Sequence, residues 1–186
     1  MKKRNHSKKQ SGVTLIELMI VIVISVILAS VAFPSYKTMV IGNRIASLTS
    51  DLHSSLLLAR SEALKRGRTV AVCKSTTPND ANPSCSAAAN DVGWGAGWIV
   101  YVDTDNSGTR GGSEEIIMVR GPYFAASTEG TVTTNIASEN ISFGFTGQTF
   151  SAAQFSISAP SGYTSKSKVI CVAIGGRARV ADGTSC

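Results

Sequence analysis

The stretch from Asp103 to Glu114 carries oxygen-bearing side chains at the spacing of a calcium-binding loop. It reads DTDNSGTRGGSE and places four candidate ligands around Gly108, namely Asp103, Asp105, Ser107 and Glu114. The flanking runs WIVYV and EEIIMVR are typical of strands, whereas this motif normally lies between helices. Because Asp, Asn, Ser and Gly also favour turns, we expect a hairpin connection here, with calcium binding as the alternative. We expect no resident cofactor.

Two arginines alternate near the C-terminus, in the run GRARV. If this segment is extended, Arg177 and Arg179 project from the same side, and Lys166 and Lys168 are the cations expected nearby. Guanidinium groups in this arrangement can bind phosphates. Since aromatic residues are sparse in this tail, we expect contact with a nucleic-acid backbone rather than with bases. The alternative is a final edge strand whose charges keep it soluble and unpaired.

The residues needed for enzymatic catalysis are scarce. Of the two histidines, His6 lies in a basic leader and His53 lies among leucines, where a packed helix residue is expected. The sequence has no nucleophile-and-base motif and no phosphate-cradling glycine loop. We therefore expect that this protein is not an enzyme.

The segment from Val13 to Phe33 is apolar except for one acid, Glu17. Its 21 residues would extend about 31 Å as a helix, which is about the thickness of a bilayer's hydrocarbon core. Five cations and no acid precede it, and this bias holds that end in the cytoplasm. An acid at the centre of a membrane helix costs about 2.5–3.5 kcal/mol, so Glu17 should have a function and a partner. The alternative is a secretory signal cleaved near Ser30–Ala32.

Beyond Pro34, apolar residues recur with a period near 3.6, which predicts an amphipathic helix. Its apolar face comprises Ile41, Ile45, Leu48, Leu52, Leu56, Ala59 and Ala63, and we expect polar residues such as Ser55 elsewhere on the helix. The helix should end before Gly67, because basic residues precede it and glycine suits a left-handed cap. We expect one long helix with Pro34 inside it.

From Thr69 onward, short β-type runs are separated by Gly, Pro, Asn, Asp and Ser. The runs are TVAVC, GWIVYV, EEIIMVR, ISFGF, AQFSIS, KVICVA and GRARV. Such strands predict an antiparallel sheet or sandwich, and about 120 residues suffice for one core against the helix. We therefore expect an α+β fold in which a long N-terminal helix packs on an antiparallel β-sheet or sandwich head.

Four cysteines lie in the part of the chain expected outside the cytoplasm, where disulfides persist: Cys73, Cys85, Cys171 and Cys186. Three pairings are open. The nearest-neighbour pairing closes two small loops, and each bridge would stabilise the fold by about 2–4 kcal/mol. The first would tie down the irregular stretch 74–97 and the second the C-terminus. Zinc is disfavoured because no CxxC spacing occurs and no histidine lies near these cysteines.

The basic leader ends in glycine and is followed by VTLIELMIVIVI, which together resemble the processing signal of type IV prepilins and pseudopilins. In that family a membrane peptidase cuts after the glycine and the new amino terminus is methylated. The resemblance implies cleavage after Gly12, N-methylation of Val13, a role in filament assembly for Glu17 and a helix-kinking role for Pro34. Val13 departs from the usual phenylalanine, which argues against a major pilin more than against processing.

The run GWIVYVDTDNSG and the terminal CVAIGGRARVADGTSC resemble minor pilins of the GspH/FimT/FimU group. Within that group, FimT-like proteins are associated with DNA uptake through a G-R-x-R motif, which Gly176, Arg177 and Arg179 match. The resemblance implies a minor pilin that helps to initiate or cap a type IV pilus and binds DNA at its tip in natural transformation. The alternative that it leaves open is a GspH-like pseudopilin of type II secretion that contacts secreted substrates.

These expectations divide the chain into a cleaved leader (1–12), a transmembrane and filament-core helix (13–33), the amphipathic half of the same helix (34–67) and a β-rich head (68–186). The expected partners are other major and minor pilins, the prepilin peptidase, the bacterial inner membrane and double-stranded DNA, with the head in the periplasm before assembly. The leader holds five of the 18 basic residues, so 13 remain against 12 acidic ones. Overall charge therefore gives no argument for a nucleic-acid partner.

Overall fold

A computed structural model of the chain describes residues 12–137 and 139–186, so most of the predicted leader lies outside the described residues. One helix, α1, covers Leu15–Arg66 and contains Pro34, as expected. Gly67 follows it with a φ of 62°, the left-handed conformation predicted for its cap. The chain forms two compact units, of which the first ends at Met39 and the second begins at Val40.

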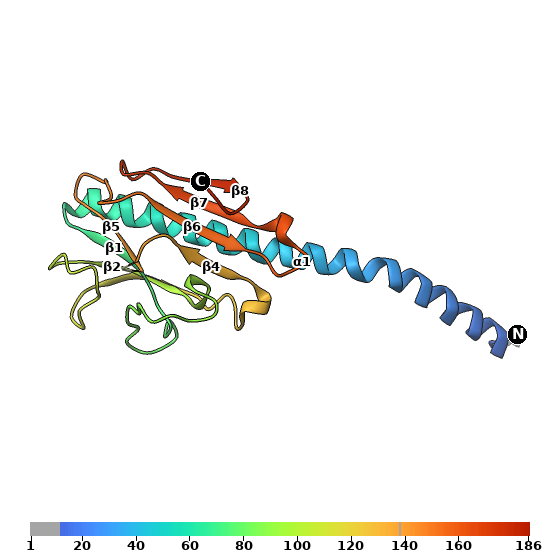
Figure 1. Cartoon of the computed structure of the whole chain (residues 1–186). Coiled ribbons are helices and arrows are strands. Elements are labelled where there is room, and N and C mark those ends of the chain that lie inside the picture. The colour runs from blue at the N-terminus through green and yellow to red at the C-terminus, as the bar shows by residue number, and fades with distance from the viewer. Residues whose placement is uncertain (1–11, 138) are drawn as a thin grey trace, which may run out of the picture. The chain divides into compact units, whose positions relative to one another are not determined.

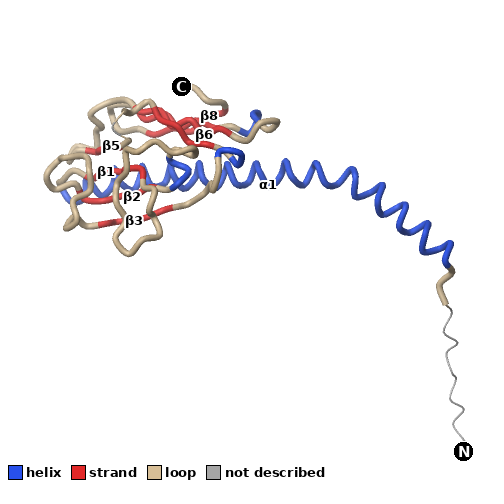
Figure 2. The backbone as a smooth tube through the Cα atoms, turned by 60° about the horizontal axis from the view of Figure 1, so that its bottom comes forward, coloured by secondary structure: helices blue, strands red, loops and turns tan. Residues whose placement is uncertain are grey.

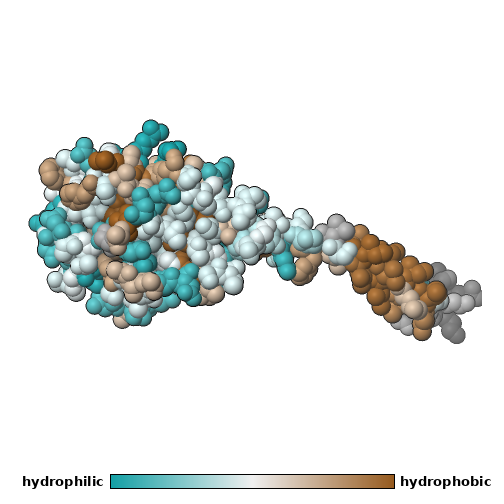
Figure 3. Space-filling view, in the orientation of Figure 1, coloured by the Kyte–Doolittle hydropathy of each residue, from teal (hydrophilic) through white to brown (hydrophobic). Residues whose placement is uncertain are grey.

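The first unit is the apolar N-terminal part of α1, coloured brown in Figure 3. Its large apolar side chains, including Leu15, Ile20 and Phe33, are exposed. Two hydroxyls in this part are satisfied within the helix, because Ser25 Oγ donates to the Val21 carbonyl and Ser30 Oγ to the Ile27 carbonyl. Among the described residues, α1 is the one helix long and apolar enough to cross a membrane.

The second unit contains two four-stranded sheets in which all neighbouring strands are antiparallel. The first sheet has the order β3-β2-β1-β5, with β1 at Val70–Lys74, β2 at Trp98–Val102, β3 at Ile116–Arg120 and β5 at Asn140–Phe143. The second has the order β4-β6-β7-β8, with β4 at Thr131–Thr134, β6 at Ala153–Ser158, β7 at Lys168–Val172 and β8 at Ala178–Asp182. Single-turn 3-10 helices lie at Trp94–Ala96, Ser127–Glu129 and Thr164–Lys166. Strand β4 was not predicted.

The C-terminal half of α1 lies between the two sheets (Figures 1 and 2). Six of the seven predicted face residues are buried, from Ile45 to Ala63, and Ile41 is partly buried at the rim. They pack in one core with residues of the first sheet such as Val72 and of the second sheet such as Phe155. The α+β prediction of a long helix packed on an antiparallel, sandwich-like head is therefore confirmed.

Ser55 corrects the predicted polar side of this helix, because it is fully buried. Its hydroxyl donates to the Asp51 carbonyl at 2.7 Å and accepts the indole N–H of Trp98 at 2.9 Å. A hydroxyl with both bonds made can be buried at little cost. Ser55 therefore joins α1 to β2 instead of facing solvent.

The irregular stretch after β1 is tied down by a disulfide and a buried cation. Cys73 and Cys85 form a disulfide, as nearest-neighbour pairing predicted. The Lys74 ammonium, only 2% exposed, donates to the Ala88 carbonyl at 2.9 Å and lies 3.5 Å from a Glu139 carboxylate oxygen. A buried lysine requires such partners.

Candidate functional site

The Gly-Arg-x-Arg segment forms the end of the β7–β8 turn and the start of β8. Ala173 N–H donates to the Arg177 carbonyl at 3.0 Å, and Gly176 N–H donates to the Ala173 carbonyl at 2.8 Å. Arg179 then pairs with Cys171 across the hairpin. Gly176 has a φ of 74°, so the turn needs a residue without a side chain at this position.

Arg177 and Arg179 lie on the outer face of the second sheet, as their alternation predicted. Both are exposed, and both line a hollow of about 420 Å³ together with Gln154, Cys171 and Cys186. Within the described part of the chain, neither arginine forms an ion pair. Two unpaired guanidinium groups beside one hollow can contact an anion together.

The C-terminal tail crosses this outer face and is fixed there by the second disulfide, Cys171–Cys186. The backbone N–H of Cys186 donates to the side-chain oxygen of Gln154 at 3.1 Å, and Ser156 Oγ donates to the Thr184 carbonyl at 2.8 Å. The hollow beside the arginines is thus walled by a preordered tail, which reduces the entropy lost on binding.

The two lysines do not join the arginines, contrary to our expectation. Lys168 pairs with Asp182 in register, on the sheet face that also carries Ile170 and the core, and the two side chains form an ion pair. This partner lowers the pKa of Asp182. Lys166 packs its side chain against the helix at Gly42, where an added Cβ would lie 3.7 Å from its Cδ. These lysines are close to the arginines in the sequence but not in space.

Three exposed apolar side chains and one arginine near the hairpin turn were missed by the sequence analysis. Thr149 N–H donates to the Ile174 carbonyl at 2.8 Å, so the loop after β5 rests on the β7–β8 turn. Phe145, Phe150 and Ile174 are 68%, 79% and 59% exposed around this contact. Arg60 of α1 brings its Nε to 3.2 Å from the position of an added Cβ on Gly176. No local pattern signals these contacts, because they depend on how the loop and helix pack.

Replacing Gly176 with alanine is expected to destabilise the head by about 2–3 kcal/mol, because a left-handed backbone disfavours a Cβ. The added Cβ would lie 1.9 Å from the Gly147 carbonyl oxygen, and the backbone must move to relieve this clash. Thermal unfolding followed by circular dichroism measures the loss. Gly175→Ala is the matched control, since its Cβ would meet nothing within 4 Å. Equal melting temperatures for the two variants would contradict the expected strain.

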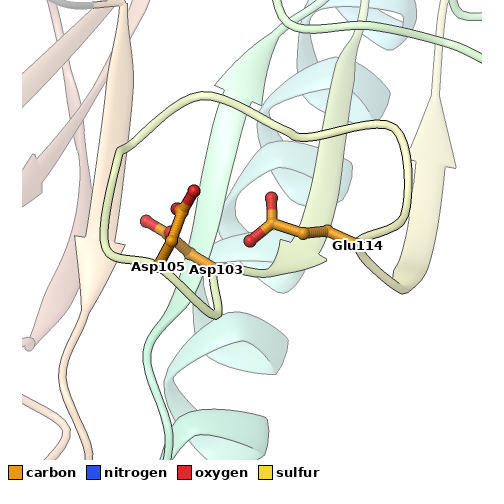
Figure 4. A group of neighbouring side chains, drawn as sticks. All are labelled: Asp103, Asp105 and Glu114. Carbon is orange, nitrogen blue, oxygen red and sulfur yellow. The ribbon is translucent and has the colours of Figure 1, made fainter.

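The predicted calcium stretch is the β2–β3 connection, so the hairpin expectation is correct as a fold. One carboxylate oxygen from each of Asp103, Asp105 and Glu114 lies within 4.8 Å of the others (Figure 4). The hydroxyl of Ser107, the fourth candidate ligand, donates to the Thr109 carbonyl at 2.9 Å. Its backbone N–H donates to the carboxylates of Asp103 at 3.1 Å and Asp105 at 2.9 Å.

The predicted processing and assembly residues lie at the start of α1. Gly12 and Val13 precede the helix and are exposed. Glu17 lies in the first turn, and its backbone N–H donates to Thr14 Oγ1 at 3.3 Å. In the described residues, no cation forms an ion pair with the Glu17 carboxylate.

Two family models match this chain, one at its start and one over most of its length. A family model described as "Type II transport protein GspH" matches residues 48–176. A second, described as "Prokaryotic N-terminal methylation motif", matches residues 7–33. The two matches together cover the start of α1, its packed half and nearly all of the two sheets.

Relatives and solved structures agree with these matches. Two proteins from Pseudomonas aeruginosa, each named "Fimbrial protein", are 31% identical over 127 residues, which is 68% of this chain and 79% of theirs. The crystal structure of the type IV minor pilin FimU from the same organism has a TM-score of 0.56 at 20% identity, covering 77% of this chain and 96% of that one. A second crystal form gives 0.51. Pilins and pseudopilins are structural proteins rather than enzymes. This chain belongs to the GspH family of type IV minor pilins and pseudopilins.

Proposed function

We propose that this protein is a minor pilin of a type IV pilus that helps to initiate or cap the filament. It is held in the bacterial inner membrane by residues 13–33, with its head in the periplasm. The prepilin peptidase cuts after Gly12, and Val13 becomes the methylated first residue. The match of residues 7–33 to the methylation motif and the exposed apolar start of α1 support this proposal.

In the proposed filament, Glu17 pairs with the new amino terminus of a neighbouring major or minor pilin. The support is that Glu17 lies on an apolar helix and has no cationic partner among the described residues. A carboxylate in hydrocarbon is costly unless it is paired, so a partner amine favours transfer from lipid to filament. Pro34 lies inside α1, where it gives the helix no N–H to donate.

The finer proposal is that Arg177 and Arg179 contact DNA phosphates when the protein stands at the pilus tip. One observation carries it: Arg177 and Arg179 line one hollow on the outer face, and neither forms an ion pair in the described part of the chain. Lys166 and Lys168 are left out of this site because each is placed elsewhere. Two phosphate contacts on a duplex predict that log K falls with log salt at a slope of about −1.8.

A mobility-shift titration of the full-length chain in non-ionic detergent tests this site. We expect Arg177→Ala with Arg179→Ala to bind duplex DNA at least about tenfold more weakly at low salt and to lose most of the salt slope. The control is Arg68→Ala with Arg120→Ala, which removes two exposed arginines, one of them on β3 of the other sheet. The site is wrong if both pairs weaken binding equally, or if the unaltered chain does not bind.

A secretion pseudopilin that contacts secreted substrates is the second candidate. The description of the family model that matches residues 48–176 favours it. The exposed Phe145, Phe150 and Ile174 would suit contact with another protein. A minor pilin co-purifies with sheared pili, whereas a secretion pseudopilin remains with the secretion machinery. The names of the fimbrial relatives favour the pilus.

A further inference from the structure

The β2–β3 connection gathers three carboxylates that lack a cationic partner. Asp103 and Glu114 are 2% and 6% exposed, and neither they nor Asp105 form an ion pair within the described ranges. The nearby Arg110 forms no ion pair with any of the three in the described part of the chain. Its guanidinium donates to the Asn82 side chain and to main-chain carbonyls, including that of Glu114. Three like charges in one partly buried cluster repel each other strongly.

Backbone N–H groups orient these carboxylates without using all their lone pairs. Asp103 accepts from the backbone N–H groups of Ser107 and Gly108 at 3.1 and 3.0 Å. One Glu114 oxygen accepts from the Gly111 N–H at 2.8 Å, and the other accepts from the Thr104 N–H at 2.6 Å and the Thr104 hydroxyl at 3.0 Å. An ionised carboxylate offers about four acceptor sites, so each retains room for another ligand. The hydrogen bonds therefore fix the oxygens in place and leave them able to coordinate a cation.

A buried hydroxyl gives an independent sign of a ligand in this loop. Tyr101 is fully buried, and its phenol oxygen has no hydrogen-bond partner among the residues that the structure describes. It precedes Asp103 by two positions on an extended chain, so both side chains lie on the same side of the sheet. Water bound to a cation between these carboxylates would accept a hydrogen bond from the phenol hydroxyl.

We propose that Asp103, Asp105 and Glu114 bind a calcium ion in the β2–β3 connection. Calcium takes oxygen ligands at about 2.3–2.6 Å, so two oxygens on opposite sides of it lie about 4.6–5.2 Å apart. The three oxygens lie within 4.8 Å of one another and can therefore share one ion without movement of the backbone. They occupy the first, third and twelfth places of a twelve-residue loop with glycine at the sixth, which is the ligand spacing of a calcium loop. Magnesium demands shorter, nearly ideal octahedral contacts and fits less well.

The test is calorimetry of the full-length chain in non-ionic detergent, stripped with a chelator and titrated with calcium chloride. We expect a dissociation constant of about 10⁻⁴–10⁻³ M, typical of extracellular calcium modules, and a rise in melting temperature. Asp105→Asn should weaken binding by about tenfold or more, because it removes a ligand charge. Asp105 is exposed, and an asparagine oxygen can still accept the Ser107 N–H, so the hairpin should fold. The control is Asp80→Asn, an exposed acid in another loop.

Terbium locates the ion, since it occupies calcium sites and luminesces when an adjacent tyrosine is excited. Tyr101→Phe should lower this luminescence more than Tyr163→Phe, because Tyr163 lies in the connection between β6 and β7 of the second sheet. The proposal is overturned if calcium gives neither heat nor a thermal shift in the unaltered chain. It is also overturned if Asp105→Asn and Asp80→Asn bind calcium equally well. Neither result bears on Arg177 and Arg179, which lie in the β7–β8 hairpin of the other sheet.

Discussion

Replacing Glu17 with leucine is expected to remove this protein from the filament while leaving membrane insertion and cleavage intact. Two opposite charges about 4 Å apart interact by about 4 kcal/mol at an effective dielectric of about 20, which corresponds to about a thousandfold in an equilibrium. Leucine also removes the cost of a carboxylate in lipid, so insertion should be at least as good. The measurement is the ratio of the protein in sheared pili to that in membranes, with processing followed by mass spectrometry of the amino terminus.

Two further variants separate the charge of Glu17 from its position. Glu17→Asp keeps the carboxylate and should restore part of the incorporation. Ser25→Leu changes an exposed residue of the same apolar segment, whose hydroxyl donates to the Val21 carbonyl within the helix, and this variant should assemble normally. Normal incorporation of Glu17→Leu would refute the assembly role.

Replacing Trp98 with alanine is expected to lower the free energy of unfolding of the head by about 3–5 kcal/mol, through a cavity and lost packing. Trp98 is fully buried, and its ring stacks on Tyr123 with centroids 5.1 Å apart and planes at 5°. The hydroxyl of Tyr123 in turn donates to an Asp51 carboxylate oxygen at 2.8 Å. With the Ser55 bond, Trp98 thus connects two points of α1 to β2. A domain is stable by only about 5–15 kcal/mol, so this loss is severe.

Smaller changes at the same contact should show a graded loss. Ser55→Ala leaves the indole N–H buried without an acceptor and should cost about 1–3 kcal/mol. Tyr123→Phe keeps the stacked ring and loses only the bond to Asp51. Denaturant unfolding ranks the three variants, and it is followed by far-ultraviolet circular dichroism because tryptophan fluorescence changes when Trp98 is removed. If Trp98→Ala costs no more than Ser55→Ala, the packing of α1 on β2 does not depend on this indole.

The elements with a strong local signal were predictable from the sequence. The stripe from Ile45 to Ala63 has the helical period, and seven of the eight strands coincide with the predicted β-type runs bounded by turn residues. Strand β4 has the sequence TVTT and only one buried residue, Val132. It is a strand because β6 pairs with it, and no periodicity in four residues could have revealed that.

The candidate sites were predictable only where their residues lie close together in the sequence. The alternation of Arg177 and Arg179 predicted that they lie on the same side of the chain. The acids from Asp103 to Glu114 lie together because they belong to one hairpin connection. Lys168 was misplaced because the face of a strand depends on its register with neighbours, and a shift of one residue reverses it. Ser55 was misplaced because a hydroxyl can be buried when it has a hydrogen-bond partner, and the sequence does not show that the Trp98 indole lies beside it.

The position of β8 against α1 has a consequence for the order in which the protein folds. His53 Nε2 on α1 lies 3.4 Å from the carbonyl oxygen of Ala178, which is 125 residues later in the chain. Contacts between such distant segments close late, because the entropy of the intervening chain is lost before the contact is gained. The surface that carries Arg177 and Arg179 therefore exists only after the last strand has docked. Any ligand of these arginines thus distinguishes a completely folded subunit from one whose second sheet is still open.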